Sequence, residues 1–226
     1  CCFGCKKRIY SRLMITGKLI TFEGIDGSGK STQIQLLEAE FEKLGISYKT
    51  FREPGGTKLS EKIRAILLDK ENIELYSNAE SLLFAAARAQ LTAEQIKPAI
   101  TKGEFVICDR FTDSTIAYQG YGRGLNINNL ELMNTIATDG LIPDITFILD
   151  IDPQKATERL KTVNPDRMEA AGIDFFKKIR QGYCQIREQN QSRCIVIDGE
   201  KPQKDISKEI HHIIMERFRK ELTCNY

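Results

Sequence analysis

The sequence predicts an α/β fold: a five-stranded parallel sheet with helices on both faces, in three layers (α/β/α). Short apolar runs alternate along the chain with stretches in which apolar residues recur every three or four positions. This alternation is typical of a parallel sheet crossed by helices. The run 105–108 is apolar throughout, as expected of a strand buried on both faces.

The first quarter of the chain supplies two strands and two helices. Residues 19–22 are largely apolar and 46–51 alternate, so both are expected to form strands. Between them, apolar residues recur at helical spacing from Ile34 until Gly45, a residue type that commonly follows helix ends. The same spacing predicts a helix over 59–69.

A long helix is expected from Ser77, because Ser77 and Glu80 have the spacing of a capping box. Its buried stripe is expected to consist of Leu82, Ala86, Ala89, Ala93, Ile96 and Ile100. Pro98 is expected to bend the last turn, since proline removes one helical hydrogen bond.

The rest of the chain repeats the alternation. Strands are expected at 105–108, 144–150 and 194–198. Helices are expected over 128–138, from Pro153, over 175–190 and around 206–218.

Composition bounds the class of protein. The 226 residues, 41% hydrophobic and 28% charged, fit one globular domain, expected over 18–222. The 33 basic residues nearly balance the 31 acidic ones, so there is no electrostatic reason to expect nucleic acid or a membrane surface as a partner. No apolar run approaches the ~20 residues that span a bilayer.

Cys2 and Cys5 have a C-x-x-C spacing, but no second pair follows to complete a metal site, and the cysteines from Cys108 onward are scattered. This predicts reduced thiols in a cytoplasmic protein. Residues 1–17 are expected to be a non-structural extension before the domain. They are too short and too rich in cysteine to predict a signal peptide.

The most informative segment lies between the first strand and the first helix and reads Gly24-Ile25-Asp26-Gly27-Ser28-Gly29-Lys30-Ser31-Thr32. It fits the phosphate-loop pattern, in which backbone N–H groups and the following helix N-terminus cradle phosphates. Lys30 would place its charge on the outer phosphates and Ser31 would ligate Mg²⁺. The alternative, an ordinary glycine turn, leaves this spacing unexplained. The segment therefore predicts a nucleoside triphosphate site.

A phosphate loop does not name a reaction. The sequence lacks N-K-x-D, expected of a GTPase, and L-S-G-G-Q, expected of an ABC-type ATPase. Phe84 and Arg88 share a helix face, which suits a nucleobase but also a core phenylalanine covered by an arginine stem. Asp109 and Arg110 end a buried strand, where α/β sheets bind ligands, although a strand-end ion pair is the alternative.

Six segments together carry a resemblance to a known family. They read F-E-G-I-D-G-S-G-K-S-T at 22–32, R-E-P-G-G-T at 52–57, L-F-A-A-A-R at 83–88, D-R-F at 109–111, Y-Q-G at 118–120 and D-R-M-E at 166–169. Over 18–222 the chain resembles the thymidylate kinases of the bacterial type, P-loop nucleoside monophosphate kinases with a short lid, here at about 161–172. The resemblance implies transfer of phosphoryl from ATP to thymidylate (dTMP) with Mg²⁺, and a homodimer.

The resemblance also implies site residues. It assigns the acceptor to Asp26, Arg64, Phe84, Arg88, Arg110, Thr115 and Tyr118. Phe84 would stack on thymine, Arg88 would bond its carbonyl oxygen, and Arg64 and Arg110 would hold the acceptor phosphate. Asp26 would reach the 3′-hydroxyl region, Thr115 the base edge, and Tyr118 would crowd the sugar 2′-position, which favours deoxyribose.

Catalysis is expected to need charge neutralisation rather than a base, because the acceptor phosphate is already ionised near neutral pH. Lys30 would neutralise the donor phosphates, and the resemblance implies that Glu53 and Asp109 organise Mg²⁺ and its waters beside Ser31. The arginine for the transferring phosphoryl group is expected from the lid, with Arg167 first and Arg159 second; solvated charges on a loop are the alternative.

Two other functions remain open from the residues alone. One is a kinase for another nucleoside monophosphate or for a deoxynucleoside; the other is a nucleotide-binding switch that transfers no phosphate. A deoxynucleoside kinase needs a carboxylate base for a neutral hydroxyl, whereas the pair Arg64 and Arg110 suits an acceptor that already carries phosphate.

Overall fold

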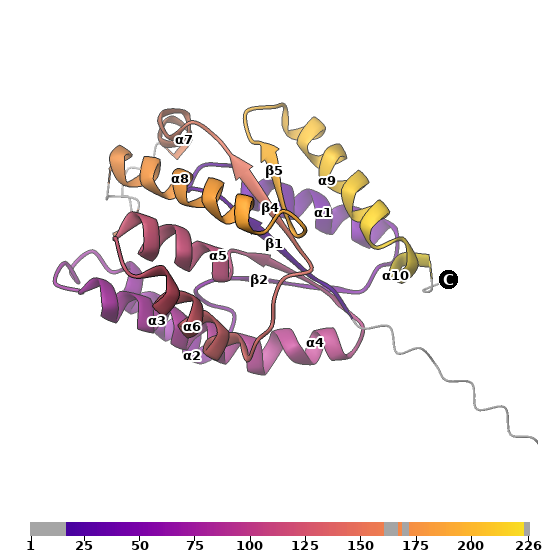
Figure 1. Cartoon of the computed structure of the whole chain (residues 1–226). Coiled ribbons are helices and arrows are strands. Elements are labelled where there is room, and N and C mark those ends of the chain that lie inside the picture. Colours follow the sequence, from indigo (N-terminus) through magenta and orange to yellow (C-terminus); the bar gives the residue numbers. More distant parts are fainter. Residues whose placement is uncertain (1–16, 161–166, 169–171, 224–226) are drawn as a thin grey trace, which may run out of the picture.

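The computed structural model describes residues 17–160, 167–168 and 172–223, and its centre is a parallel sheet (Figure 1). The strands run in the order β2-β3-β1-β4-β5. Their bounds are β1 Leu19–Glu23, β2 Tyr48–Arg52, β3 Phe105–Asp109, β4 Ile145–Asp150 and β5 Cys194–Asp198. The predicted five-stranded parallel sheet and three-layer fold are confirmed.

The helices cover both faces. Their bounds are α1 Lys30–Lys43, α2 Lys58–Leu68, α3 Ser77–Leu91, α4 Lys97–Thr101, α5 Thr112–Thr115, α6 Ile127–Thr138, α7 Pro153–Leu160, α8 Ile173–Gln189, α9 Gln203–Arg217 and α10 Arg219–Thr223. Two π-helical segments, η1 Thr92–Ile96 and η2 Ile116–Gly122, link neighbouring helices. None of the helices in the described ranges is long and apolar enough to cross a membrane.

Alternate strand residues build the core on opposite faces of the sheet. Ile20 and Ile107 face one side, where α1 and α9 pack, while Leu19 and Val106 face the other side, against α3, η1 and α4. A third cluster joins α8 to η2 and β4. Because all strands are parallel, their carboxyl ends meet at one edge, and the loops leaving that edge are brought together.

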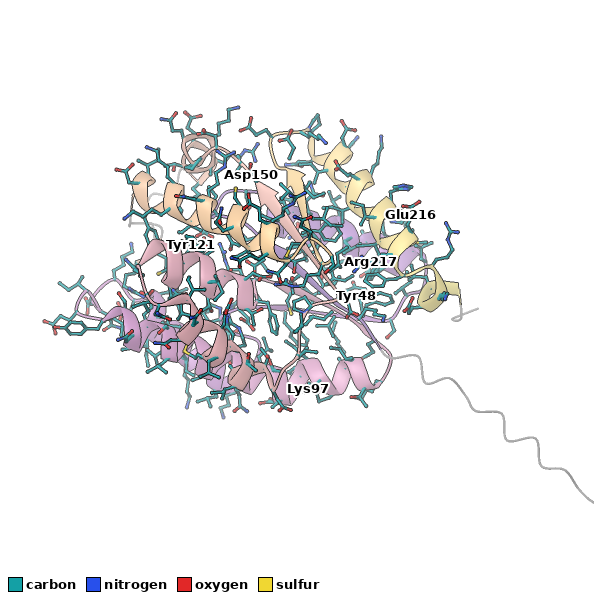
Figure 2. All side chains as sticks on the ribbon, in the orientation of Figure 1. Tyr48, Lys97, Tyr121, Asp150, Glu216 and Arg217 are labelled. Atoms are coloured by element: carbon teal, nitrogen blue, oxygen red, sulfur yellow. The ribbon has the colours of Figure 1, made fainter. Side chains whose placement is uncertain are left out.

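Ion pairs fasten some of these helices to the sheet. Arg180 of α8 donates from Nε and Nη2 to the carboxylate of Asp150 at 2.6 and 2.7 Å. Asp150 lies at the end of β4 (Figure 2). Within the described residues Cys108, Cys184 and Cys194 are free thiols, as expected of reduced cysteines.

The predicted buried stripe of the long helix is confirmed at Ile96, which is fully buried, while Ala89 and Ile100 are half-buried and the other three members are wrong. Leu82 is 61% exposed, and Ala86 and Ala93 are also exposed. The buried face instead carries Arg88 and Leu91 together with small residues. The pattern misled because a buried arginine interrupts the inward face while apolar residues occupy the outer one.

Two smaller expectations about this helix also differ. No side chain caps its N-terminus, so the capping box is wrong: the carboxylate of Glu80 is buried and accepts from Arg123 and Gln119 instead. The expected single helix is divided before Pro98, because the π-helical segment η1 follows α3 and α4 begins at Lys97.

Candidate active site

A cleft of about 760 Å³ lies at the carboxyl edge of the sheet. Most of the residues proposed from the sequence line it together: Asp26, Gly27, Ser28, Gly29, Lys30, Ser31, Thr32, Glu53, Arg64, Phe84, Arg88, Asp109, Arg110, Thr115, Tyr118 and Arg159. Gly24, Ile25 and Arg167 do not line the cleft. Sequence segments that lie more than a hundred residues apart therefore share one site.

The phosphate loop needs its glycines for close approach. Gly24 and Gly27 have φ of 132° and 80°, values that side chains rarely tolerate. A Cβ on Gly24 would lie 2.5 Å from the carbonyl oxygen of Leu149, and one on Gly27 would lie 2.4 Å from that of Ala156. The loop is thus packed against β4 and α7, which fixes where its N–H groups point.

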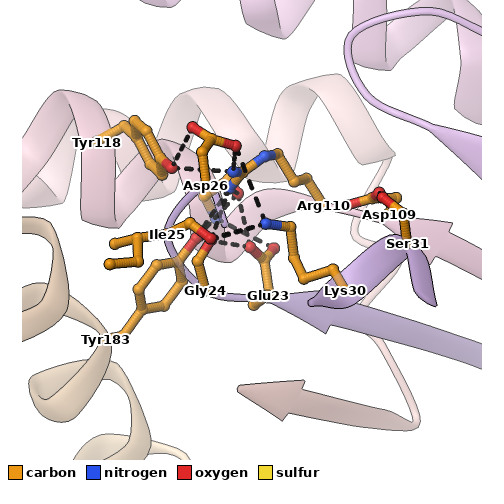
Figure 3. Close-up of polar contacts among 11 residues, drawn as sticks. Glu23, Gly24, Ile25, Asp26, Lys30, Ser31, Asp109, Arg110, Tyr118 and Tyr183 are labelled. Atoms are coloured by element: carbon orange, nitrogen blue, oxygen red, sulfur yellow. Dashed lines mark hydrogen bonds and ion pairs between the residues drawn. The ribbon is translucent and has the colours of Figure 1, made fainter. Parts of the chain in front are cut away.

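Lys30 is buried at the start of α1. Its Nζ donates to the carbonyl oxygens of Gly24 and Ile25 at 3.2 and 3.0 Å and lies 4.0 Å from Asp26 (Figure 3). Burial, and next the positive charge of Arg110, lower the pKa of Lys30. The ammonium is therefore held inside the loop, where phosphate oxygens can attract it.

Arg110 has a left-handed backbone, with φ of 72°, which turns its side chain back over the phosphate loop. Nη2 donates to Asp26 Oδ1 at 2.5 Å and to the Tyr118 hydroxyl at 2.9 Å, while Nη1 donates to the Gly24 carbonyl at 3.0 Å. Burial raises the pKa of Asp26, but Arg110 and Lys30 outweigh this and hold it at about 2. The ion pair of Arg110 is made with Asp26, not with Asp109.

Behind Arg110 lies a buried carboxylate, Glu23, at the end of β1 (Figure 3). Oε1 accepts from the backbone N–H groups of Phe111 and Ser114 at 2.8 and 3.2 Å. Oε2 accepts from the hydroxyls of Ser114 and Tyr183 at 2.6 and 2.8 Å. Burial, and next the negative charge of Asp113, raise the pKa of Glu23 to about 7. Glu23 therefore anchors the turn that presents Arg110.

Arg88 on α3 is 2% exposed and bound on several sides. Nε donates to Glu53 Oε2 at 2.7 Å, and Nη2 donates to the Phe111 carbonyl at 3.0 Å. Nη1 donates to Thr115 Oγ1 at 2.8 Å and to Asn134 Oδ1 at 2.6 Å. A covering arginine stem would keep its head in water, so that alternative is excluded. Residues of the described chain take four of the five N–H groups, which leaves one for a ligand.

Phe84 and Arg64 line the cleft on the same side as Arg88, away from the phosphate loop. Phe84 lies one turn before Arg88 on α3 and is half-buried, so an aromatic ring and a guanidinium line the same pocket. Arg64 of α2 is half-buried and donates from Nη1 to the Pro54 carbonyl at 2.9 Å. This arrangement can hold a planar base at one end and an anion at the other.

Oxygen groups suited to a cation gather between the two halves. Ser31 Oγ donates to Asp109 Oδ2 at 3.1 Å, and both residues line the cleft with Glu53. Glu53 Oε1 is buried and has no partner among the described residues, although its other oxygen binds Arg88. Across the described ranges no three His, Cys, Asp or Glu residues cluster as a protein-only metal cage.

The two lid arginines lie in different places. Arg159, at the end of α7, lines the cleft and donates from Nη1 to the Gly199 carbonyl at 3.1 Å. Arg167 Nη1 pairs with buried Glu80 at 2.6 Å, and its Nε donates to the Leu67 carbonyl at 2.9 Å. Arg159 thus lines the cleft and Arg167 does not, and which of the two acts on the transferring phosphoryl group stays a prediction. The rest of the expected lid, 161–166 and 169–171, lies outside the described residues, as do residues 1–16 of the expected extension.

Sequence reasoning missed part of the lining. Gln33, Gly199, Lys201, Gln203 and Ile206 face the phosphate-loop end of the cleft. The signal was available, because residues after the last strand of a parallel sheet lie at the same edge as the phosphate loop. The sequence also did not predict the buried polar residues that hold arginines or the turn before α5, namely Glu23, Glu80 and Asn134. Nothing in the local spacing of residues marks these three.

Comparisons with known proteins agree with this geometry. The family model described as Thymidylate kinase matches residues 22–210. A thymidylate kinase of Caldanaerobacter subterraneus is 49% identical over 183 residues, covering 81% of this chain and 88% of that protein. One of Chlorobium luteolum is 46% identical over 213 residues, covering 90% and 99%. The crystal structure of thymidylate kinase from Ehrlichia chaffeensis has a TM-score of 0.72 and 38% identity, covering 88% of this chain and 99% of that one.

Proposed function

The chain belongs to the thymidylate kinase family, and we propose that the cleft described above carries out the family's reaction with the residue roles given below. The enzyme is a nucleoside monophosphate kinase that transfers a phosphoryl group from ATP to dTMP. The observation that supports the assignment of roles is the cleft itself: one cavity joins a phosphate loop to an aromatic-arginine pocket.

The acceptor half is proposed to bind dTMP through its base and its phosphate. Phe84 stacks on the thymine ring, and the free N–H of Arg88 donates to a base carbonyl. Arg64 and Arg110 bind the acceptor phosphate. When the phosphate binds, Arg110 exchanges its ion pair with Asp26 for one with the phosphate. Tyr118 and Asp26, joined by a 3.1 Å hydrogen bond, line the sugar side.

The donor half is proposed to bind ATP. The backbone of Gly24 to Thr32 surrounds the phosphates, and Lys30 leaves the loop carbonyls for the outer phosphate oxygens. Gln33, Lys201 and Gln203 stand beside the loop, where the nucleoside of ATP extends.

The oxygen groups in the cleft fit Mg²⁺. This ion is held by one or two carboxylates together with phosphates and water, and the free buried oxygen of Glu53 is such a donor. We propose that Ser31, Asp109 and Glu53 hold the ion and its waters. Bound there, Mg²⁺ would neutralise phosphate charge during transfer.

The mechanism requires positioning and charge neutralisation. The second pKa of a phosphate monoester is near ~6, so the attacking oxygen is ionised at neutral pH and needs no base. Lys30 and Arg110 reduce the repulsion between two anions brought end to end. We assign the charge on the transferring phosphoryl group to Arg159, which lines the cleft, with Arg167 as the second candidate.

A homodimer is proposed from the outer surface of α2, α3 and α6, which pack side by side (Figure 1). These helices expose the large apolar residues Leu59, Ile66, Leu82, Leu132 and Ile136. Contiguous exposed apolar residues are typical of protein interfaces. The single domain at 18–222 and the cytoplasmic location remain predictions from the sequence.

Acceptor-dependent ADP release tests the proposed roles. We expect turnover with dTMP to exceed that with uridylate, deoxycytidylate and unphosphorylated thymidine. Lys30→Ala should lower kcat by ~10²-fold or more, because an electrostatic contact to the transferring group is lost. Lys43→Ala, at the exposed end of the same helix, is the control. Near-full turnover of Lys30→Ala would refute the phosphate-loop role.

A further inference from the structure

Asn134 of α6 belongs to none of the nucleotide-binding motifs, yet it is buried beside the cleft, with 6% of its surface exposed. Its Oδ1 accepts from Arg88 Nη1 at 2.6 Å, and its Nδ2 donates to the Thr112 carbonyl at 3.1 Å. Both ends of the amide are engaged, so the orientation of the side chain is fixed.

The contact with Asn134 is the shortest of the four hydrogen bonds made by the Arg88 guanidinium. The other three acceptors are Glu53, Thr115 and the Phe111 carbonyl, which come from segments that themselves line or border the cleft. Asn134 instead reaches Arg88 from the inner face of α6. It therefore sets the direction of the guanidinium plane independently of the groups that meet substrate.

Resting on the proposed function, in which Arg88 reads the base, we propose that Asn134 is a positioning residue that sets the selection of thymine over cytosine. Thymine presents a carbonyl oxygen at position 4, whereas cytosine presents an amino group. A guanidinium carries donors only. A guanidinium held in one plane donates to the carbonyl oxygen of thymine but meets the amino group of cytosine donor to donor. A guanidinium that is free to turn discriminates less between the two bases.

The test compares kcat/KM for dTMP and deoxycytidylate in Asn134→Leu, which keeps bulk and removes the acceptor. We expect the dTMP preference to fall about tenfold and the KM for dTMP to rise, with the KM for ATP within about twofold of the parent. Asn134→Asp keeps an oxygen on Arg88 and should retain the preference. Thr135→Val, which alters an exposed residue bonded only to its own helix, should change nothing.

An unchanged preference in Asn134→Leu would overturn the proposal. Should that variant fail to fold, Asn134→Ser carries the same test, because its shorter hydroxyl does not reach Arg88. Arg88→Ala separates the two claims. Loss of the preference in Arg88→Ala but not in the Asn134 variants overturns the role of Asn134 alone; an unchanged preference in Arg88→Ala overturns the base-reading role of Arg88 as well.

Discussion

Each buried positive side chain in the cleft is stabilised by carboxylates or carbonyl oxygens of the protein itself. Lys30 is bound by two loop carbonyls, Arg110 by Asp26, and Arg88 by Glu53. A buried charge without such a partner would cost several kcal/mol. The site therefore presents preformed positive groups: Lys30 and Arg110 are proposed to exchange partners when phosphate binds, and Arg88 keeps its partners.

The pair of Asp26 and Arg110 predicts a pH effect on stability. The pKa of Asp26 is about 2 in the fold and 3.8 ordinarily, so the folded state binds the proton less tightly than the unfolded state. The pair thus contributes up to about 2 kcal/mol above pH ~4, and this is lost as the pH falls toward 2.

Urea unfolding between pH 2 and 5 measures this contribution. Asp26→Asn should show a smaller loss of unfolding free energy on acidification than the parent. Asp174→Asn, at an exposed position on α8, is the matched control. Identical pH dependence of the parent and Asp26→Asn would contradict the assignment.

The two lid arginines make separable predictions. Arg159→Ala should reduce kcat by roughly 10²-fold while changing the KM for ATP much less, because the charge acts on the transferring group. Arg167→Ala should chiefly lower the thermal midpoint, since it leaves buried Glu80 with one fewer counter-charge. The opposite pattern in steady-state kinetics and thermal melts would return the catalytic role to Arg167.

Among the elements, the position of the short helix α5 and of the segment η2 depends on a carboxylate that comes from strand β1. Glu23 of β1 accepts the N–H groups of Phe111 and Ser114 at the start of α5, and it holds α8 through Tyr183. Hydrogen bonds of Glu23, the residue before the phosphate loop, thus connect that loop to the segment that carries Arg110 and Tyr118.

Glu23→Gln tests this connection. The parent pKa of about 7 lies above the ordinary 4.5, so the unfolded state loses its proton first and stability falls as pH rises from 4.5 to 7. The variant should lack this component and should bind dTMP more weakly, because Arg110 loses its supported turn. Equilibrium unfolding across this pH range and the KM for dTMP provide the measurements. If neither changes, Glu23 does not support the turn.

Most elements could be predicted from the sequence because hydrophobic spacing follows the period of a helix or a strand, even where it misassigns the buried face. All five strands and the longer helices follow from it, and the phosphate loop follows from glycine positions that the backbone requires. The inward face of α3 could not be predicted, since it is built around Arg88 and small residues. Asn134 and Glu23 could not be found either, because their partners lie 46 and up to 160 residues away.

At the scale of the whole molecule, the two helices that carry Arg88 and its partner Asn134 also carry part of the proposed dimer surface. α3 carries Arg88 inward and Leu82 outward, and α6 carries Asn134 inward and Ile136 outward. Association of two copies through this surface would therefore constrain the helices that hold Arg88, the arginine proposed to read the base.

Ile136→Glu tests the surface. A charge placed among apolar residues should shift the protein from dimer to monomer in analytical ultracentrifugation, with a decrease in dTMP affinity and little change in folding. Because the Ile136 side chain is 73% exposed, its replacement is not expected to impair folding of the single chain. Val196→Glu, at another partly exposed apolar residue on β5, is the control. A dimer that persists in Ile136→Glu would place the contact elsewhere.

The carboxylate of Glu53 belongs to both the proposed base-binding pocket and the proposed cation site. Oε2 accepts from Arg88, the arginine proposed to read the base, and Oε1 is buried without a partner among the described residues and is proposed to face the cation. Free energies linked through a shared group are reciprocal. With Glu53 in both proposed roles, binding of the cation would change nucleoside affinity by the same factor as nucleoside binding changes cation affinity. One side chain would then couple the two sites without a movement of domains.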